Sequence, residues 1–266
     1  MKSDRPTTDR CNICGHEKPL SEDHVPPKFW NNSKAKRYSL AFGTLDPAQA
    51  KHSFPQKANN GIAYRSVCRD CNSKLGGSYD KELQLFCESA SRVIKSKLFI
   101  PIISADIRVN RVSRGVVGHL LAAKNFYDDK CLIDVALRNY LADDTALPPA
   151  DLHLYCYPYH HSAIVVGRDL VPVGNDVPKG MISVISSFPL SFILTEASIQ
   201  GMTDLFAKCS HDIDEKKHVI VSRRSACIPG SNILRHYAWP INISEDGTLG
   251  VIGGLAVQSL IIAKES

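Results

Sequence analysis

The sequence has no apolar run long enough to cross a membrane as a helix. A bilayer-spanning helix needs about 20 mostly apolar residues, and the most apolar stretch, GMISVISSFPLSFIL, is interrupted by serines and a proline. We expect that stretch to form two buried strands. Internal repeats and low-complexity tracts are also missing. The chain is therefore expected to be globular and to have no membrane association.

The first ten residues, MKSDRPTTDR, lack the apolar core of a secretory leader. A cytoplasmic location is therefore expected, where the nine cysteines would be thiols rather than disulfides. The composition of 44% hydrophobic and 22% charged residues is that of an ordinary globular protein. A chain of 266 residues can form one large domain or two smaller ones.

Acidic residues are scarce in one part of the chain. The net charge is only +5, but nine basic residues face two acidic ones between Lys28 and Lys74. The basic residues are Lys28, Lys34, Lys36, Arg37, Lys51, Lys57, Arg65, Arg69 and Lys74, and the acidic ones are Asp46 and Asp70. Such an excess suits a polyanionic partner such as nucleic acid. A solvated basic loop is the other interpretation.

The character of the sequence changes near residue 78. The preceding part is rich in Cys, Pro, Asn and Lys, which is typical of a small region stabilised by a metal. Helical spacing of apolar residues predicts a helix over 79–98, with Ser78 as its N-cap, Asp80 and Glu82 at its positive end, and Pro101 beyond its end. A second helix is predicted over 113–127.

The remaining sequence is dominated by short segments rich in β-branched and aromatic residues. We expect strands over 152–158, 162–167, 180–186, 190–195, 217–222 and 255–263. The predicted fold class is therefore α+β. Residues 1–99 would form a small zinc-stabilised domain with its following helix, and residues 100–266 a mixed α+β domain of unknown role.

Two C-x-x-C pairs, Cys11–Cys14 and Cys68–Cys71, flank the basic segment. Each pair can present two sulfurs to one ion from a tight turn, and two pairs complete a tetrahedral zinc site. Gly15 directly after the first pair favours such a turn. A thioredoxin-like redox role would need a βαβ context that is missing here. The other cysteines, Cys87, Cys131, Cys156, Cys209 and Cys227, are interpreted as small buried apolar residues.

Between the pairs lies LSEDHVPPKFW, and the second pair continues as CRDCNSKLGG. The order of an acidic-His-Val-x-Pro segment and C-x-x-C-N resembles a branch of the HNH endonuclease family, over about residues 11–82. That resemblance implies a ββα-metal motif stabilised by a four-cysteine zinc site. It implies that His24 is the general base and that Asp23 and Asn72 bind a catalytic Mg2+ or Mn2+. Lys28 and Lys74 are expected to contact nucleic acid.

The sequence departs from the family in the middle of the motif. The residue that orients the base is usually an Asn, and the corresponding position here is Ala63. Asn59 and Asn60 are the nearest substitutes, and Asn60, which precedes a turn-forming glycine, is expected to take that role. Asp23 and His24 also pose a geometric problem, because neighbouring residues of a regular strand point to opposite faces. A bulge or a bend at the strand end would solve it.

The resemblance implies a phosphodiester hydrolase acting on double-stranded DNA. With an unassigned second domain, a chain of this size resembles effectors in bacterial defence or mobile elements. Cutting a duplex with one site per chain would call for a homodimer or for two successive nicks. One alternative is a four-cysteine zinc module that binds nucleic acid without cutting it. Another is a scaffold whose protein partner or activator binds residues 100–266.

Overall fold

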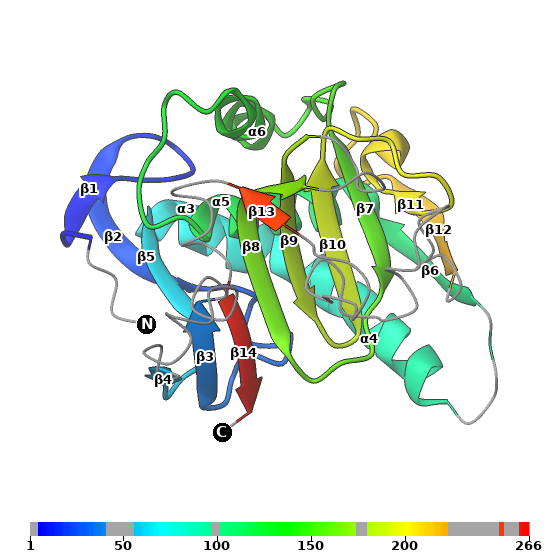
Figure 1. The fold of residues 1–266 in the computed structure, drawn as a ribbon. Helices are drawn as coiled ribbons and strands as arrows, with labels where there is room; N and C mark the ends of the chain where they lie inside the picture. Colours follow the sequence, from blue (N-terminus) through cyan, green and yellow to red (C-terminus); the bar gives the residue numbers. More distant parts are fainter. Residues whose placement is uncertain are drawn as a thin grey trace.

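The computed structural model describes residues 5–40, 56–96, 100, 102–173, 180–222, 250–252 and 261–265. Several sequence-based expectations lie outside these residues. They are Cys227, Lys51, Asp46, Pro101, residues 97–98 of the first expected helix and residues 255–260 of the last expected strand. The fold is a mixture of sheets with few helices (Figure 1). None of the helices in the described part of the chain has the length and apolarity that a membrane crossing requires.

A three-stranded antiparallel sheet carries both C-x-x-C pairs. Its order is β1-β2-β5, with β1 at Thr8–Arg10, β2 at Glu17–His24 and β5 at Ala63–Cys68. Three helical segments follow β5 without a break: α3 at Arg69–Lys74, a π-helical turn at Leu75–Tyr79 and α4 at Asp80–Lys95. Strands β2 and β5 pair with each other, and α3 contacts both of them.

A nine-stranded sheet forms the larger layer, in the order β11-β7-β10-β9-β8-β14-β3-β4, with β13 also paired to β8 (Figure 1). Its strands are β3 (Lys36–Leu40), β4 (Gln56–Ala58), β7 (His153–Pro158), β8 (Ile164–Val173), β9 (Ile182–Ser187), β10 (Leu190–Thr195), β11 (Thr203–Asp204), β13 (Gly250–Ile252) and β14 (Ile261–Glu265). The other elements are β6 (Ile102–Arg108), which pairs with β12 (Lys216–Ser222), the helices α5 (Val109–Ala122) and α6 (Leu132–Ala142), and a 3-10 turn at Phe206–Lys208.

Helix α5 is the centre of the molecule. Every residue of it except Arg111 is buried, so it has no solvent-exposed face and packs on all sides. Helices α4 and α5 lie behind the large sheet (Figure 1), and Phe86 of α4 meets Phe192 of β10 at 6.5 Å between ring centroids. Trp30, which follows β2, packs edge-on against the same Phe192 at 5.4 Å. One apolar cluster therefore joins residues from both halves of the sequence.

The boundary expected at residue 99 crosses this shared core. Strand β3, from the first range, pairs with β14 from the second, with Tyr38 opposite Ala263. The cluster that contains Cys11 also contains Val221. A division at 99/100 would therefore cut both the large sheet and the core. The two ranges describe only where the sequence motifs lie along the chain.

Helix boundaries differ from the expected ones for identifiable reasons. Helix α5 begins at Val109 and ends at Ala122 rather than spanning 113–127. The side chain of Asn12, in the first cysteine turn, donates to the carbonyls of Leu121 and Lys124 and so binds the end of α5. Ser78 is not an N-cap, because it lies inside the π-helical turn that joins α3 to α4. The expectation that Ser78 begins a helix is wrong.

Candidate functional site

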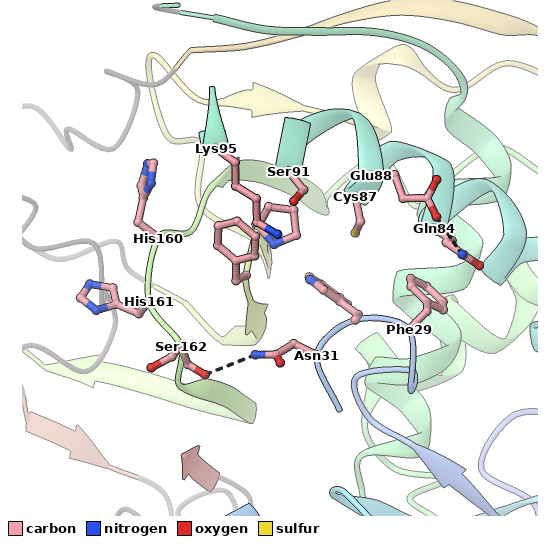
Figure 2. A pocket seen from close by; sticks show the side chains of 13 residues that line it. Phe29, Asn31, Gln84, Cys87, Glu88, Ser91, Lys95, His160, His161 and Ser162 are labelled. Carbon is pink, nitrogen blue, oxygen red and sulfur yellow. Dashed lines mark hydrogen bonds between the residues drawn. The ribbon is translucent and has the colours of Figure 1, made fainter. Parts of the chain in front are cut away.

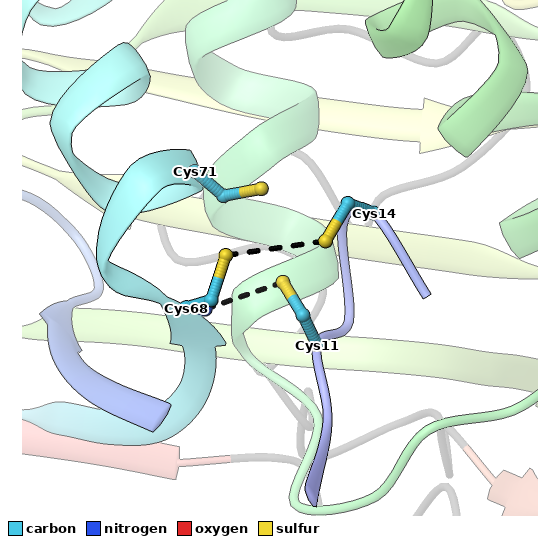
Figure 3. A group of neighbouring side chains, drawn as sticks. All are labelled: Cys11, Cys14, Cys68 and Cys71. Atoms are coloured by element: carbon cyan, nitrogen blue, oxygen red, sulfur yellow. Dashed lines mark hydrogen bonds between the residues drawn. The ribbon is translucent and has the colours of Figure 1, made fainter. Parts of the chain in front are cut away.

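The four cysteines of the two C-x-x-C pairs converge (Figure 3). All four Sγ atoms lie within 4.8 Å of one another, and those of Cys14 and Cys68 are 3.9 Å apart. A tetrahedral zinc ion with Zn–S bonds of about 2.3 Å would hold its sulfurs about 3.8 Å apart. The four cysteines therefore form a possible metal-binding site of the size and chemistry that suit zinc, as expected from their spacing.

The surroundings of this cluster favour a thiolate at Cys11. A hydrogen bond from Cys71 lowers the pKa of Cys11 to about 4, and backbone N–H groups of Cys14, Cys68 and Ile13 add to this effect against the opposing effect of burial. The same interaction with Cys11 raises the pKa of Cys71. Four sulfurs this close together, two of them buried, need a positive charge before all of them can ionise. Gly15 completes the turn with φ of +72°.

A pocket of about 480 Å3 opens at the end of β2 and is lined by Asp23, His24, Lys28, Asn72 and Asp80, among others. We call it the His24 pocket. Asp23 and His24 both line it, although they are neighbours on one strand. The pairing of β2 with β5 slips between Ser21 and Glu22, so the strand carries an irregularity two residues before Asp23. The slip lies before the pair, however, and Asp23 and His24 themselves are in regular register with Tyr64 and Ala63 at the end of the strand, so this bulge does not change the alternation between them.

His24 is held by a main-chain carbonyl. Its Nε2 lies 2.9 Å from the carbonyl oxygen of Asn60. Since a carbonyl oxygen can only accept, Nε2 carries the hydrogen and Nδ1 of the neutral ring holds the lone pair. Burial lowers the pKa of His24, against the opposing effect of the Asn60 carbonyl. Asn60 therefore reaches His24 as expected, but with its backbone rather than its side chain.

The turn that presents the Asn60 carbonyl is held by Asn32, a residue outside the sequence motifs. The fully buried Asn32 donates to the carbonyls of Pro26 and Ile62, at 2.6 and 2.8 Å, and accepts from the Ile62 amide at 2.7 Å. Asn32 thus joins the loop after His24 to the turn at residues 60–62. Gly61, in that turn, has φ of +85°, and a Cβ there would lie 2.0 Å from the carbonyl oxygen of Asn32.

Replacing Gly61 by alanine is expected to destabilise the protein by about 1–3 kcal/mol, because both the backbone angle and the space are unsuitable for a side chain. The measurement is the free energy of unfolding in urea. Gly77→Ala is the control, since nothing lies within 4 Å of a Cβ added there. Equal stability of the two variants would contradict the role of Gly61 in this turn.

Asn72 lies on α3 with its amide orientation fixed. Its Nδ2 donates to Ser21 Oγ and to the Glu22 carbonyl, both at 3.1 Å. The Glu22 carbonyl can only accept, so the Asn72 atom that faces it is Nδ2. Oδ1 is then the amide atom that is left to accept a hydrogen bond or to bind a cation. Asn72 lines the His24 pocket together with Asp23, as its place in the motif predicts. An amide oxygen and a carboxylate are ligands that suit Mg2+.

A buried histidine connects two carboxylates at the floor of this pocket. His119 of α5 is 1% exposed, with Nδ1 2.8 Å from Asp23 Oδ2 and Nε2 2.7 Å from Asp80 Oδ1. Burial alone would lower the pKa of His119, but Asp23 and Asp80 outweigh it and raise this pKa to about 10. His119 is therefore a cation at neutral pH. It holds Asp23 by one carboxylate oxygen.

The acidic residues at the start of α4 therefore have roles other than the expected one. They were predicted to stabilise the positive end of a helix dipole, but the helical segments run continuously from α3 into α4. Asp80 pairs with His119. Glu82 accepts from the backbone amide and the guanidinium of Arg108, at 2.9 and 3.0 Å. Both carboxylates stabilise tertiary contacts.

The two lysines expected to contact nucleic acid differ in position. Lys28 is exposed and lines the His24 pocket. Lys74 is not among the residues that line it, and its Nζ lies 2.9 Å from Asp144 Oδ1 in an ion pair. The structure therefore brings Lys28, but not Lys74, to the candidate site.

Comparison with known proteins gives no family assignment. No family model matches the chain, and neither the curated proteins nor the solved structures contain a significant match. The function is therefore inferred from the four-cysteine cluster and the His24 pocket.

A second group of possible metal ligands, Asp128, Cys131 and Asp134, has cations of its own. Lys124 Nζ lies 2.6 Å from Asp134 Oδ2, and Arg168 Nη2 lies 2.6 Å from Asp134 Oδ1. With an ammonium and a guanidinium already paired to its most buried carboxylate, this group is a buried ion-pair network.

Proposed function

We propose that the protein is a metal-dependent endonuclease of the HNH type that hydrolyses phosphodiester bonds, with double-stranded DNA as its substrate. One observation carries the proposal: a single pocket is lined by His24, Asp23 and Asn72, which are the residues that the motif requires. The order of β2, β5 and α3 agrees with a ββα-metal motif. The four-cysteine cluster on the same sheet agrees with the zinc site of that branch.

His24 would act as the general base. With Nε2–H donated to the Asn60 carbonyl, Nδ1 can take a proton from a water molecule that attacks phosphorus. Burial lowers the pKa of His24, which keeps the ring neutral at physiological pH. The Asn60 carbonyl thus does for this histidine what a side-chain amide does in the usual motif. The alanine at position 63 is compatible with catalysis for this reason.

Asp23 and Asn72 would hold the catalytic cation, Mg2+ or Mn2+, through carboxylate and amide oxygens. When bound, such an ion neutralises the charge that develops on the phosphate. Two protein ligands suit Mg2+, which keeps most of its water. His119 would fix the carboxylate of Asp23 by its Oδ2, and Lys28 at the mouth of the pocket would contact a neighbouring phosphate.

The alternative is a zinc module that binds nucleic acid without cutting it. The ion pair of Asp23 with His119 favours this alternative, because it gives Asp23 a structural role. Supercoiled plasmid incubated with the protein and Mg2+, Mn2+ or EDTA separates the two. The nuclease converts plasmid to nicked or linear DNA only with the divalent ion. Salt-sensitive binding with intact plasmid under every condition would instead support the binding module.

A further inference from the structure

A second pocket, of about 580 Å3, adjoins the His24 pocket (Figure 2). We call it the Phe188 pocket, and we propose that it binds one unpaired nucleobase of the nucleic-acid strand that lies in the His24 pocket. This inference rests on the proposed function, because it assigns the neighbouring site to a phosphodiester. It gives the protein a preference for substrates with an unstacked base beside the cut.

The two pockets form one groove. Phe29 and Gln84 line both of them. One face of α4 lies along the whole groove: Asp80 and Gln84 line the first pocket, and Gln84, Glu88, Ser91 and Lys95 line the second. These residues are three or four positions apart, which is the spacing of one helix face. From Asp80 to Lys95 the helix rises by about 22 Å, a length that accommodates several nucleotides of one strand.

The side chains of the Phe188 pocket suit a base. Phe188 and Phe29 are half-buried and contribute aromatic rings, on which every base can stack. Lys95 Nζ lies over the Phe188 ring, 5.3 Å from its centroid, so a base that stacks on this face would displace the ammonium, which could then pair with the adjoining phosphate. Gln84 Nε2 donates to Glu88 Oε1 at 2.8 Å, which orients Gln84 Oε1 to accept from an exocyclic amine.

The pocket is built from parts of the chain that are far apart in the sequence. Its walls are α4, the loop after β2, and the loops that join β7 to β8 and β9 to β10 (Figure 2). Asn31 Nδ2 donates to the Ser162 carbonyl at 3.4 Å and connects two of these loops. This arrangement gives the C-terminal half of the chain a direct part in substrate binding, in place of a separate regulatory role.

A base in a Watson–Crick pair is stacked between its neighbours and cannot enter a pocket. Filling the Phe188 pocket therefore requires a single strand, a mismatch or a flipped nucleotide. The energy of unpairing is smallest where pairing is already lost. The protein is thus expected to bind single-stranded DNA better than a duplex of the same sequence.

The test is fluorescence anisotropy with a labelled short oligonucleotide, single-stranded or paired with its complement, in EDTA so that cleavage cannot occur. The wild type is expected to bind the single strand about 10-fold more tightly than the duplex, a difference that one stacked base supplies. Phe188→Ala is expected to remove that preference, and Lys95→Ala to weaken binding of the single strand. Phe126→Ala is the matched control, because the exposed Phe126 also has a lysine ammonium, that of Lys124, over its ring and lines neither pocket.

Equal affinity of the wild type for the two substrates would overturn the proposal. So would a loss in Phe188→Ala that is the same for single strand and duplex, or no larger than in Phe126→Ala. These outcomes are distinct from failure of the nuclease proposal, which is measured by plasmid cleavage with Mg2+ or Mn2+ in the wild type. If the protein prefers single strands through Phe188 but never cuts, the base-pocket proposal stands and the nuclease proposal is wrong.

Discussion

Replacing Cys11 and Cys68 together by serine is expected to abolish the binding of one zinc ion and to destabilise the protein by more than about 5 kcal/mol. A structural zinc contributes about 10–16 kcal/mol of apparent binding free energy in small domains, comparable to the whole stability of many proteins. Both cysteines are buried in the main core cluster, so the loss is expected to reach beyond the cysteine turns. Metal content by mass spectrometry and unfolding in urea measure the two effects.

Cys131→Ser is the control for this experiment. Cys131 is the N-cap of α6, a position that serine fills well, so neither zinc content nor stability should fall. A double variant that keeps one zinc ion per chain and the unfolding midpoint of the wild type would contradict a metal site at the four cysteines. A chelator should reproduce the effect of the double substitution on the unmodified chain.

The second large effect is expected at His119. His119→Leu leaves the carboxylates of Asp23 and Asp80 buried without their cation, since their side chains are 7% and 17% exposed. Removing one member of a buried ion pair destabilises by about 3–5 kcal/mol. His153→Leu is the control, because His153 pairs with Asp204 at a similar 2.7 Å but is 30% exposed. Its loss is expected to stay within about 1 kcal/mol.

The same triad predicts a dependence of stability on pH. The pKa of His119 is raised in the folded protein to about 10, above its ordinary value of about 6.5. The stabilisation is therefore complete below about pH 6.5 and is lost as the pH rises towards 10. Wild-type stability should fall across that range, and His119→Gln should show a smaller fall. Parallel pH profiles of the two proteins would contradict a cationic His119.

The parts of the site that sequence could predict are those encoded by local order. These are the two C-x-x-C turns, the Asp23–His24 pair and the asparagine after Cys71. Each lies in a short motif whose spacing suits one function, which is zinc binding for the cysteines and catalysis for the others. The role of Asn60 could be predicted in part, because proximity to the second pair favours it. The use of its carbonyl could not be predicted, because every residue carries one.

His119 could not be predicted, because its partners are distant in the sequence. It lies 96 residues from Asp23 and 39 from Asp80, in an apolar segment where a lone histidine indicates nothing. A histidine in a fully buried helix is the one feature that could have raised the question. The role of Asn32 could not be predicted either, because Asn32 bonds to the turn at residues 60–62 only in the folded chain.

The fold, like the site, has features that the local sequence specifies and others that depend on contacts between distant residues. Strand β10 has the expected bounds of 190–195, since its β-branched and aromatic residues and the proline before it specify it locally. The pairing of β3 with β14 joins the two ends of the chain, and no local pattern encodes it. Domains over 1–99 and 100–266 were expected because the composition of the sequence changes near residue 78. The shared sheet and core are the result of contacts that only the folded chain makes.

The most direct test of the account is plasmid cleavage with Mg2+ or Mn2+ by the wild type, by His24→Ala and by His218→Ala. His218 is an exposed histidine paired with Asp106, far from the residues that line the His24 pocket, and its loss should leave activity unchanged. We expect His24→Ala to lose activity by about 100-fold or more, as removal of a general base does, with its fold and zinc content intact. Cleavage by His24→Ala at the wild-type rate would contradict the proposed catalytic site.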